Sequence, residues 1–125
     1  LGVGVASKTE HECRGKTIVY ATDTEHGTAR DAQLIDFARD ADIFIYDAMY
    51  TEDEYLGRAG SPKIGWGHST IETAVKVADD AGVGTLVLFH HEPTRNDDAM
   101  DELVKTAKKL RKGTIAAREG LTIKL

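Results

Sequence analysis

The sequence predicts an α/β fold in a single domain, residues 1–125. Short apolar runs at residues 18–22, 43–46 and 85–89 have the length and composition of buried strands, and amphipathic helical patterns lie between them. Each run is followed by side chains that bind metals or protons, namely Asp23, Asp47 and the pair His90 and His91. Because strand ends in an α/β sheet share one edge, we expect these side chains to converge there.

The composition is that of an ordinary globular chain, with 41% hydrophobic and 30% charged residues. A net charge of −5 argues against a general nucleic-acid coat, which needs a basic surface, so nucleic acid is expected only as a substrate. Cys13 is the single cysteine, so no intrachain disulfide can form, and we expect a cytoplasmic location. No apolar run has the length of a membrane span, so no membrane partner is expected.

The first third of the chain predicts a hairpin, a helix and a strand. Residues 1–7 and 16–22 are strand-like, with turn-forming residues between them. Asp31 is placed to cap the N-terminus of a helix. The apolar face of that helix consists of Leu34, Ile35 and Ala38. Residues 41–48 are apolar enough for a strand that is covered on both faces.

The middle of the chain predicts a long loop and then a strong helix. Residues 49–66 show no clear period, and one turn of helix is expected at residues 51–55. Residues 69–81 form the helix, with Ser69 and Glu72 as a predicted capping box. Its apolar stripe is Ile71, Ala74, Val75 and Ala78.

The last third predicts one strand, one helix and two short closing strands. The strand is residues 85–89, and Asn96 or Asp97 caps the helix that follows. The apolar stripe of this helix is Met100, Leu103, Val104, Ala107 and Leu110. The closing strands are expected at residues 114–117 and 121–125.

Three strand ends and one loop carry the candidate chemistry. Asp23 is placed either to bridge two divalent ions or to cap a turn. His68 precedes the predicted helix, where the helix dipole favours the neutral imidazole; it suits proton donation to a leaving group, or it is a surface residue. His90 and His91 are adjacent and point to opposite sides of a strand, so at most one faces a site.

Other polar residues have weaker claims. Asp47 is either a phosphoacceptor, as in receiver domains, or a supporting carboxylate or strand-end cap. Glu25 and His26 follow Asp23 in a loop that we expect to be solvated. His11 is expected at the surface. The thiol of Cys13, with no activating base near it in sequence, is not expected to be a nucleophile.

Taken together, four motifs resemble the metallo-β-lactamase-fold hydrolases. In order they are Tyr-Ala-Thr-Asp-Thr at residues 20–24, Tyr-Asp-Ala-Met-Tyr at 46–50, Gly-Trp-Gly-His-Ser-Thr at 65–70 and Leu-Val-Leu-Phe-His-His-Glu-Pro at 86–93. The closing residues, 116–125, are also similar to a C-terminus of this family. The similarity is greatest to the branch of ribonuclease Z and the phosphoribosyl cyclic phosphodiesterases.

The resemblance implies a fold, a site and a reaction. The fold is the C-terminal half of a four-layer αββα sandwich, a mixed sheet with flanking helices. Asp23 would bridge two divalent ions, with zinc expected and manganese or iron as alternatives, and His90 would bind one of them, or His91 if the register is off by one. A hydroxide held between the ions attacks phosphorus or a carbonyl in this family. His68 would protonate the leaving oxygen of a small phosphodiester or ester.

One departure from the family changes the expected activity. The family carries an earlier His-x-His-x-Asp-His cluster, and the five histidines of this chain form no His-x-His pair. Zinc needs about four ligands, so Asp23 and His90 do not complete a dinuclear centre. The chain is therefore expected to be inactive alone and to need an N-terminal half or a second copy, which would cover an otherwise exposed apolar face.

Three explanations stay open for that departure. The chain is a fragment of a longer hydrolase, a separate subunit, or a stand-alone half; Leu1 enters in mid-strand, which favours a fragment. The alternative function is a catalytically incomplete half-domain that acts as a non-enzymatic folding or interaction module. A third hypothesis is a flavodoxin-like or receiver-like regulatory domain that uses Asp47.

Overall fold

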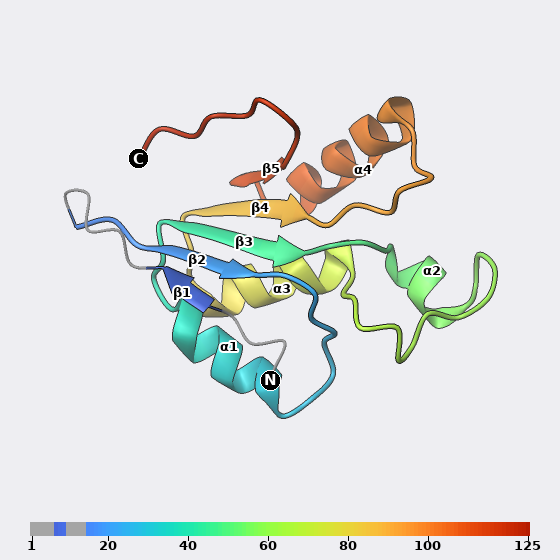
Figure 1. Ribbon diagram of the computed structural model, residues 1–125, viewed down its shortest axis with the longest axis horizontal. Helices are drawn as coiled ribbons and strands as arrows, with labels where there is room; N and C mark the ends of the chain where they lie inside the picture. The colour runs from blue at the N-terminus through green and yellow to red at the C-terminus, as the bar shows by residue number, and fades with distance from the viewer. Residues whose placement is uncertain (1–6, 10–14) are drawn as a thin grey trace.

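A computed structural model describes residues 7–9 and 15–125, which form one sheet with helices against it. The sheet has five strands in the order β1-β2-β3-β4-β5 (Figure 1). Only the β1–β2 pair is antiparallel, so the sheet is mixed, as predicted. The strands are β1 Ser7–Thr9, β2 Ile18–Ala21, β3 Ile43–Asp47, β4 Thr85–Phe89 and β5 Thr114–Ala116.

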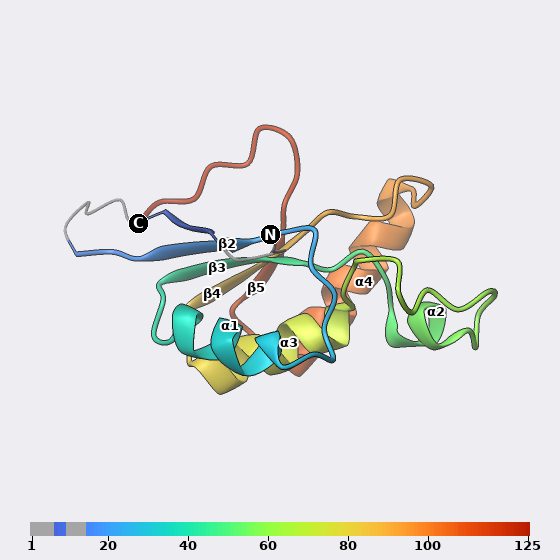
Figure 2. The same cartoon turned by 60° about the horizontal axis from the view of Figure 1, so that its bottom comes forward.

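Helices cover one face of this sheet, apart from one short helix that lies beyond the strand ends (Figure 1). They are α1 Arg30–Ala38, α2 Glu52–Leu56, α3 Ile71–Ala81 and α4 Asp97–Leu110. Figure 2 shows α1 and α3 side by side under the same face, and α4 extends this layer by contacts with β5 and α3. No helix in the described part of the chain is long and apolar enough to cross a membrane.

The core fills the space between the sheet and these helices. Alternate strand residues point into it, because successive side chains of a strand face opposite sides. The strand residues that face this core are Val19, Ala21, Phe44, Tyr46, Leu86 and Leu88. They meet small residues of α3, among them Ala74 and Ala78, which let the helix approach the sheet closely. Burying each large side chain stabilises the fold by about 1.5–3 kcal/mol.

The other face of the sheet carries apolar residues of mixed burial, with Ile43 and Val87 buried and others only partly covered. Tyr20, Ile45 and Phe89 are half-buried there. The rings of Tyr20 and Phe89 contact each other edge to face, with centroids 5.5 Å apart. No helix of the described residues lies on this side (Figure 2). The described residues thus form one sheet and one helical layer, which is half of a four-layer sandwich.

Several predicted elements are present. The strand at residues 85–89 is confirmed, and β3 lies within the predicted 41–48. β1 pairs antiparallel with β2, but it covers residues 7–9 where the sequence predicts a strand at 1–7, and residues 1–6 and 10–14 lie outside the described part. The helical turn expected near residue 51 is α2, where Thr51 and Glu54 form a capping box. Asn96 caps α4 by accepting a hydrogen bond from the backbone N–H of Ala99 (2.9 Å).

Two predicted caps are wrong. Asp31 lies inside the first turn of α1, because its carboxylate instead accepts a hydrogen bond from the N–H of Gly27 (2.7 Å). α3 begins at residue 71, and Thr70 caps it by accepting from Thr73 N–H (3.0 Å). Ser69 cannot cap this helix because its hydroxyl is used elsewhere: it donates to the carbonyl of Thr24 and accepts from the Tyr46 hydroxyl.

The predicted closing strand at residues 121–125 is also wrong. Leu121 donates its N–H to the carbonyl of Arg118 (3.1 Å), a turn that follows the end of β5. Gly120 adopts a left-handed conformation in this turn, with φ of 79°. The segment therefore leaves the sheet and pairs with no strand of the described residues.

Candidate metal and proton-transfer site

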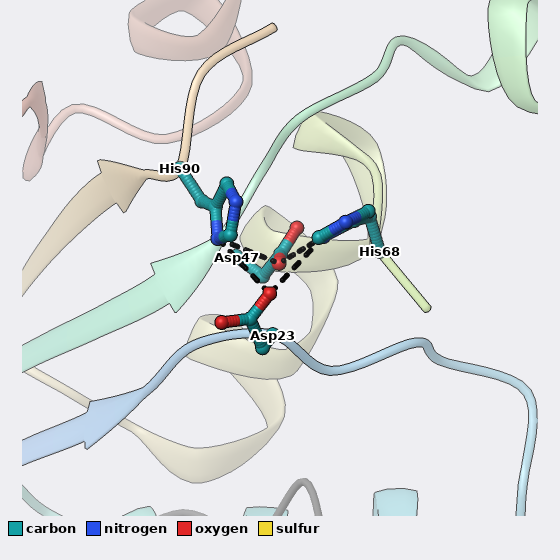
Figure 3. A group of neighbouring side chains, drawn as sticks. All are labelled: Asp23, Asp47, His68 and His90. Carbon is teal, nitrogen blue, oxygen red and sulfur yellow. Dashed lines mark hydrogen bonds and ion pairs between the residues drawn. The ribbon is translucent and has the colours of Figure 1, made fainter. Parts of the chain in front are cut away.

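Four polar side chains meet where the parallel strands end (Figure 3). They are Asp23, Asp47, His68 and His90, and one ligand atom from each lies within 4.8 Å of the others. Asp23 follows β2, Asp47 ends β3 and His90 follows β4, so the parallel register of the strands brings them together. His68 arrives from the loop before α3.

Asp47 is the buried centre of this cluster, with no solvent exposure. One carboxylate oxygen accepts from His68 Nδ1 at 2.9 Å. The other accepts from the backbone N–H groups of Ser69 (3.0 Å) and Met49 (3.4 Å). The carboxylate therefore fixes both the ring of His68 and the backbone next to it. Because Nδ1 is used in this way, Nε2 is the nitrogen of His68 that remains for a substrate.

The burial of Asp47 decides between its predicted roles. A phosphoacceptor aspartate needs access to the phosphodonor, and this carboxylate has no exposed surface. Both of its oxygens already accept hydrogen bonds. The receiver-like hypothesis is therefore wrong, and Asp47 acts as a supporting carboxylate for His68.

His90 enters the cluster through an unusual backbone conformation. Its φ is 60°, in the left-handed region that residues other than glycine seldom adopt. Its Nδ1 lies 3.2 Å from Thr22 Oγ1, 3.5 Å from Asp23 Oδ1 and 3.7 Å from Asp47 Oδ2. Such strain costs about 1–3 kcal/mol and is typical of functional positions.

Asp23 shares the left-handed backbone and closes the cluster on the solvent side. Its φ is 50°. Its side chain is 69% exposed, and Oδ1 lies 3.9 Å from His68 Nδ1. No ion pair in the described part of the chain joins Asp23 or Asp47 to a lysine or arginine. The basic side chains beside them are the imidazoles of His68 and His90.

His91 lies outside the cluster. Its Nε2 is 3.0 Å from the carbonyl of Ala117, to which it donates. Burial lowers the pKa of His91, and the nearby positive charges of Arg95 and His90 act in the same direction, against the hydrogen bond to Ala117. The side chains of the two adjacent histidines thus separate, and the structure brings only His90 to Asp23.

Glu25 is a residue whose position the sequence did not predict. From the sequence, Glu25 is expected to be solvated in its loop, but its carboxylate accepts hydrogen bonds from Tyr55 OH (2.8 Å), Gly65 N–H (2.6 Å) and Gly67 N–H (3.1 Å). Burial raises its pKa, but these hydrogen bonds outweigh burial and hold the pKa below its usual range. The three partners are far away in sequence, so no local pattern could reveal them. Glu25 therefore ties the loop after β2 to the loop that carries His68.

The remaining predicted side chains do not join the site. His26 packs its ring against Tyr55, with centroids 4.6 Å apart. His11 and Cys13 lie outside the described residues.

The donor set fits a divalent transition metal. Carboxylate oxygens and imidazole nitrogens are ligands that zinc, manganese and iron all accept. The cluster offers two of each, and in the described part of the chain its two carboxylates have no lysine or arginine partner. Such a concentration of negative charge and lone pairs is what a cation would stabilise.

Comparison with known proteins gives a consistent result. Residues 10–91 match the family model of the beta-lactamase superfamily domain. The chain is 34% identical over 115 residues to ribonuclease Z of Lachnospira eligens, and 32% identical over 112 residues to ribonuclease Z of Archaeoglobus fulgidus. Each alignment covers 90% of this chain but only 34% and 33% of the relative. The chain thus spans about a third of the length of these relatives.

Solved structures show the same fold. The metallo-beta-lactamase fold protein YhfI from Bacillus subtilis matches with a TM-score of 0.66 and 25% identity, over 93% of this chain and 47% of YhfI. The short form of human tRNase Z matches with a TM-score of 0.60 and 16% identity, over 94% of this chain and 36% of that one. The predicted metallo-β-lactamase-type α/β fold is confirmed.

Proposed function

We propose that this chain, which belongs to the beta-lactamase superfamily domain family, is the C-terminal half of a metal-dependent hydrolase that cleaves phosphodiester bonds in RNA. The observation that carries the proposal is the cluster of Asp23, Asp47, His68 and His90 at one sheet edge. The relatives named ribonuclease Z support RNA as the substrate class.

Asp23 and His90 are the residues that would hold metal. Asp23 is exposed, and among the described residues only histidines lie beside it, so its carboxylate would be available to two ions. His90 presents its ring beside Asp23, and zinc is the ion that suits this pair best, with manganese or iron as alternatives. Bound divalent ions supply Lewis-acid activation of water and neutralise charge on a phosphoryl group.

His68 would carry the proton. Asp47 holds its Nδ1 and so directs Nε2 toward the substrate, in the same way that a buried aspartate orients the histidine of a catalytic triad. A histidine held in this way can protonate the leaving oxygen of a cleaved phosphodiester. Asp47 would then be a positioning residue, because it acts through His68 and does not contact the substrate.

The described residues leave a metal centre short of ligands. With Asp47 and His68 engaged in their own hydrogen bond, two donors remain, and zinc takes about four. We propose that the missing ligands come from an N-terminal half of the same fold, which would also cover the half-buried apolar face of the sheet. Half of a site binds metal more weakly than a complete one.

Metal titration tests the proposal directly. Calorimetric titration of the full chain with zinc should give binding that Asp23→Asn and His90→Ala each weaken by about tenfold or more, since each loses one ligand of a small set. Asp80→Asn removes an exposed carboxylate of α3 outside the cluster and should leave the affinity unchanged. Hydrolysis of bis-p-nitrophenyl phosphate with and without zinc completes the measurement.

Two outcomes would count against the proposal. Zinc affinity that survives both cluster substitutions would place the metal elsewhere. No zinc binding together with an intact fold would favour the alternative function, a non-enzymatic folding or interaction module.

A further inference from the structure

We propose that Trp66 is a stacking platform for a nucleobase of the RNA substrate, next to the scissile phosphate. This inference rests on the proposed RNA hydrolase function and assigns a part of the substrate to a surface outside the cluster. Trp66 precedes His68 by two positions in the loop that leads to α3. Aromatic side chains of this kind bind single-stranded nucleic acid through the π-faces of its bases.

Among the large hydrophobic side chains that the described residues leave exposed, Trp66 is the most exposed aromatic one. It is 61% exposed, and the ammonium of Lys63 lies over the ring, 4.3 Å from its centroid. An indole that served the core would be covered by apolar neighbours. This one has a cation on its ring and most of its surface available to a ligand.

The backbone on both sides of Trp66 is held in place. Glu25 accepts hydrogen bonds from the N–H groups of Gly65 and Gly67, the residues directly before and after the tryptophan. The N–H of Trp66 itself donates to the carbonyl of Lys63 (3.1 Å). Both glycines have φ near 86°, which other residues seldom adopt. Glycine at these two positions therefore lets the loop take this conformation without strain. A fixed aromatic surface loses little conformational entropy when a ligand stacks on it.

A hollow beside Trp66 extends to Tyr50, whose ring contacts His68. It has a volume of about 340 Å³, in the range of small-molecule sites, and its walls include Trp66, Lys63 and Tyr50. The Tyr50 ring contacts His68 edge to face, with centroids 6.2 Å apart. A ligand in the hollow therefore lies one side chain away from the histidine that would protonate the leaving group.

The charges of the hollow select the base and not the phosphate. Its walls carry the carboxylates of Glu54 and Glu92 and the ammonium of Lys63, and Glu54 is already paired with Arg95. The Glu92 carboxylate, which forms no ion pair among the described residues, repels phosphate but can accept a hydrogen bond from an N–H group of a base. The phosphate would thus lie at the cluster of Asp23 and His90, where metal is proposed, with the adjoining base on Trp66.

Fluorescence of the chain reports on this contact directly, because Trp66 is its single tryptophan. We expect tetra-adenylate, titrated into the full chain in EDTA, to quench the emission in a saturable way. An abasic ribose-phosphate tetramer of equal charge should leave the emission unchanged. Because EDTA removes divalent ions, this result does not depend on the metal proposal.

Variants separate stacking from general loop effects. By anisotropy of fluorescein-labelled tetra-adenylate, Trp66→Ala should weaken binding by about tenfold or more, and Trp66→Phe by only about threefold, since a ring is retained. Ile64→Ala, which removes a side chain of the same loop with the same 61% exposure, should have no effect. The inference is overturned if tetra-adenylate causes no quenching, if the abasic tetramer quenches equally, or if the Trp66→Ala and Ile64→Ala variants weaken binding to the same degree.

Discussion

The carboxylate of Glu54 and those of Asp23 and Asp47 have different electrostatic surroundings. Glu54, on α2, forms a bidentate ion pair with Arg95, with N–O distances of 2.9 and 3.0 Å. Arg95 also donates to the carbonyl of Met49 (2.9 Å), so its guanidinium binds both a carboxylate and the backbone. Asp23 and Asp47 have no lysine or arginine partner in the described part of the chain, and two imidazoles lie beside them.

This difference separates a structural charge from a functional one. A bidentate pair between an arginine and a carboxylate holds two segments together and leaves little for a ligand. Two carboxylates within reach of each other repel, and the repulsion is relieved by a cation or a proton. Substitutions should therefore affect folding in the region of Glu54 and binding in the region of Asp23, with Asp47 contributing to both.

Asp47→Ala should have the largest effect on stability. It leaves the N–H of Ser69 and Nδ1 of His68 without an acceptor in a buried site, so we expect a loss of about 2–4 kcal/mol in the free energy of unfolding. Zinc affinity should fall with it. Urea unfolding, followed by circular dichroism, measures the first effect and calorimetry the second.

Asp47→Asn provides the control for that substitution. The amide keeps the volume and one acceptor, so most of the stability should return, but its NH₂ group cannot accept from Nδ1 of His68. Nitrogen-15 chemical shifts of the imidazole should then report a changed tautomer of His68. An unchanged tautomer would show that Asp47 fills space without orienting the ring.

Glu54→Gln should have an intermediate effect that depends on pH. Although burial raises the pKa of Glu54, the hydrogen bonds from Arg95 and from Thr51 N–H outweigh it and hold the pKa below the usual 4.5. The ionised pair therefore contributes above pH 4.5, and its contribution is lost as the pH falls through the lower pKa of the folded state. We expect a loss of about 1–2 kcal/mol at pH 7 that shrinks in acid.

Unfolding of both proteins between pH 3 and 7 measures this effect. Zinc affinity should not change, in contrast to the Asp47 variants. A difference in stability that is constant with pH, or a fall in zinc affinity, would contradict the separation between the two regions.

Glu25→Gln should have the smallest effect on stability. A neutral amide still accepts some of the hydrogen bonds from Gly65, Gly67 and Tyr55, so we expect a loss of about 0.5–1.5 kcal/mol. The loop should become more mobile, which would lower the steady-state fluorescence anisotropy of Trp66. Glu102→Gln, on the exposed surface of α4, is the matched control. Equal anisotropy in the two variants would argue that Glu25 does not hold the loop around Trp66.

Local sequence patterns were sufficient for much of the fold. The apolar runs and the helical periods located β3, β4, α3 and α4, because burial on one side of an element leaves a repeat in its own residues. The two helix caps failed for a related reason. Ser69 and Asp31 have the chemistry of caps, but hydroxyl and carboxylate groups bond to whichever donor the folded chain places nearest.

The sequence by itself determined that Asp23, Asp47 and His90 follow strands, since apolar runs and the residues after them are local features. It also indicated His68 as a candidate site residue, through the Gly-Trp-Gly-His-Ser-Thr motif and the resemblance to metallo-β-lactamase-fold hydrolases. Only the tertiary structure decided that Asp47 orients His68, that His90 and not His91 meets Asp23, and that Glu25 holds the loop around Trp66. The partners in these contacts are about 20 to 70 residues apart, so their distances exist only after the strands align and the loops close over the sheet edge.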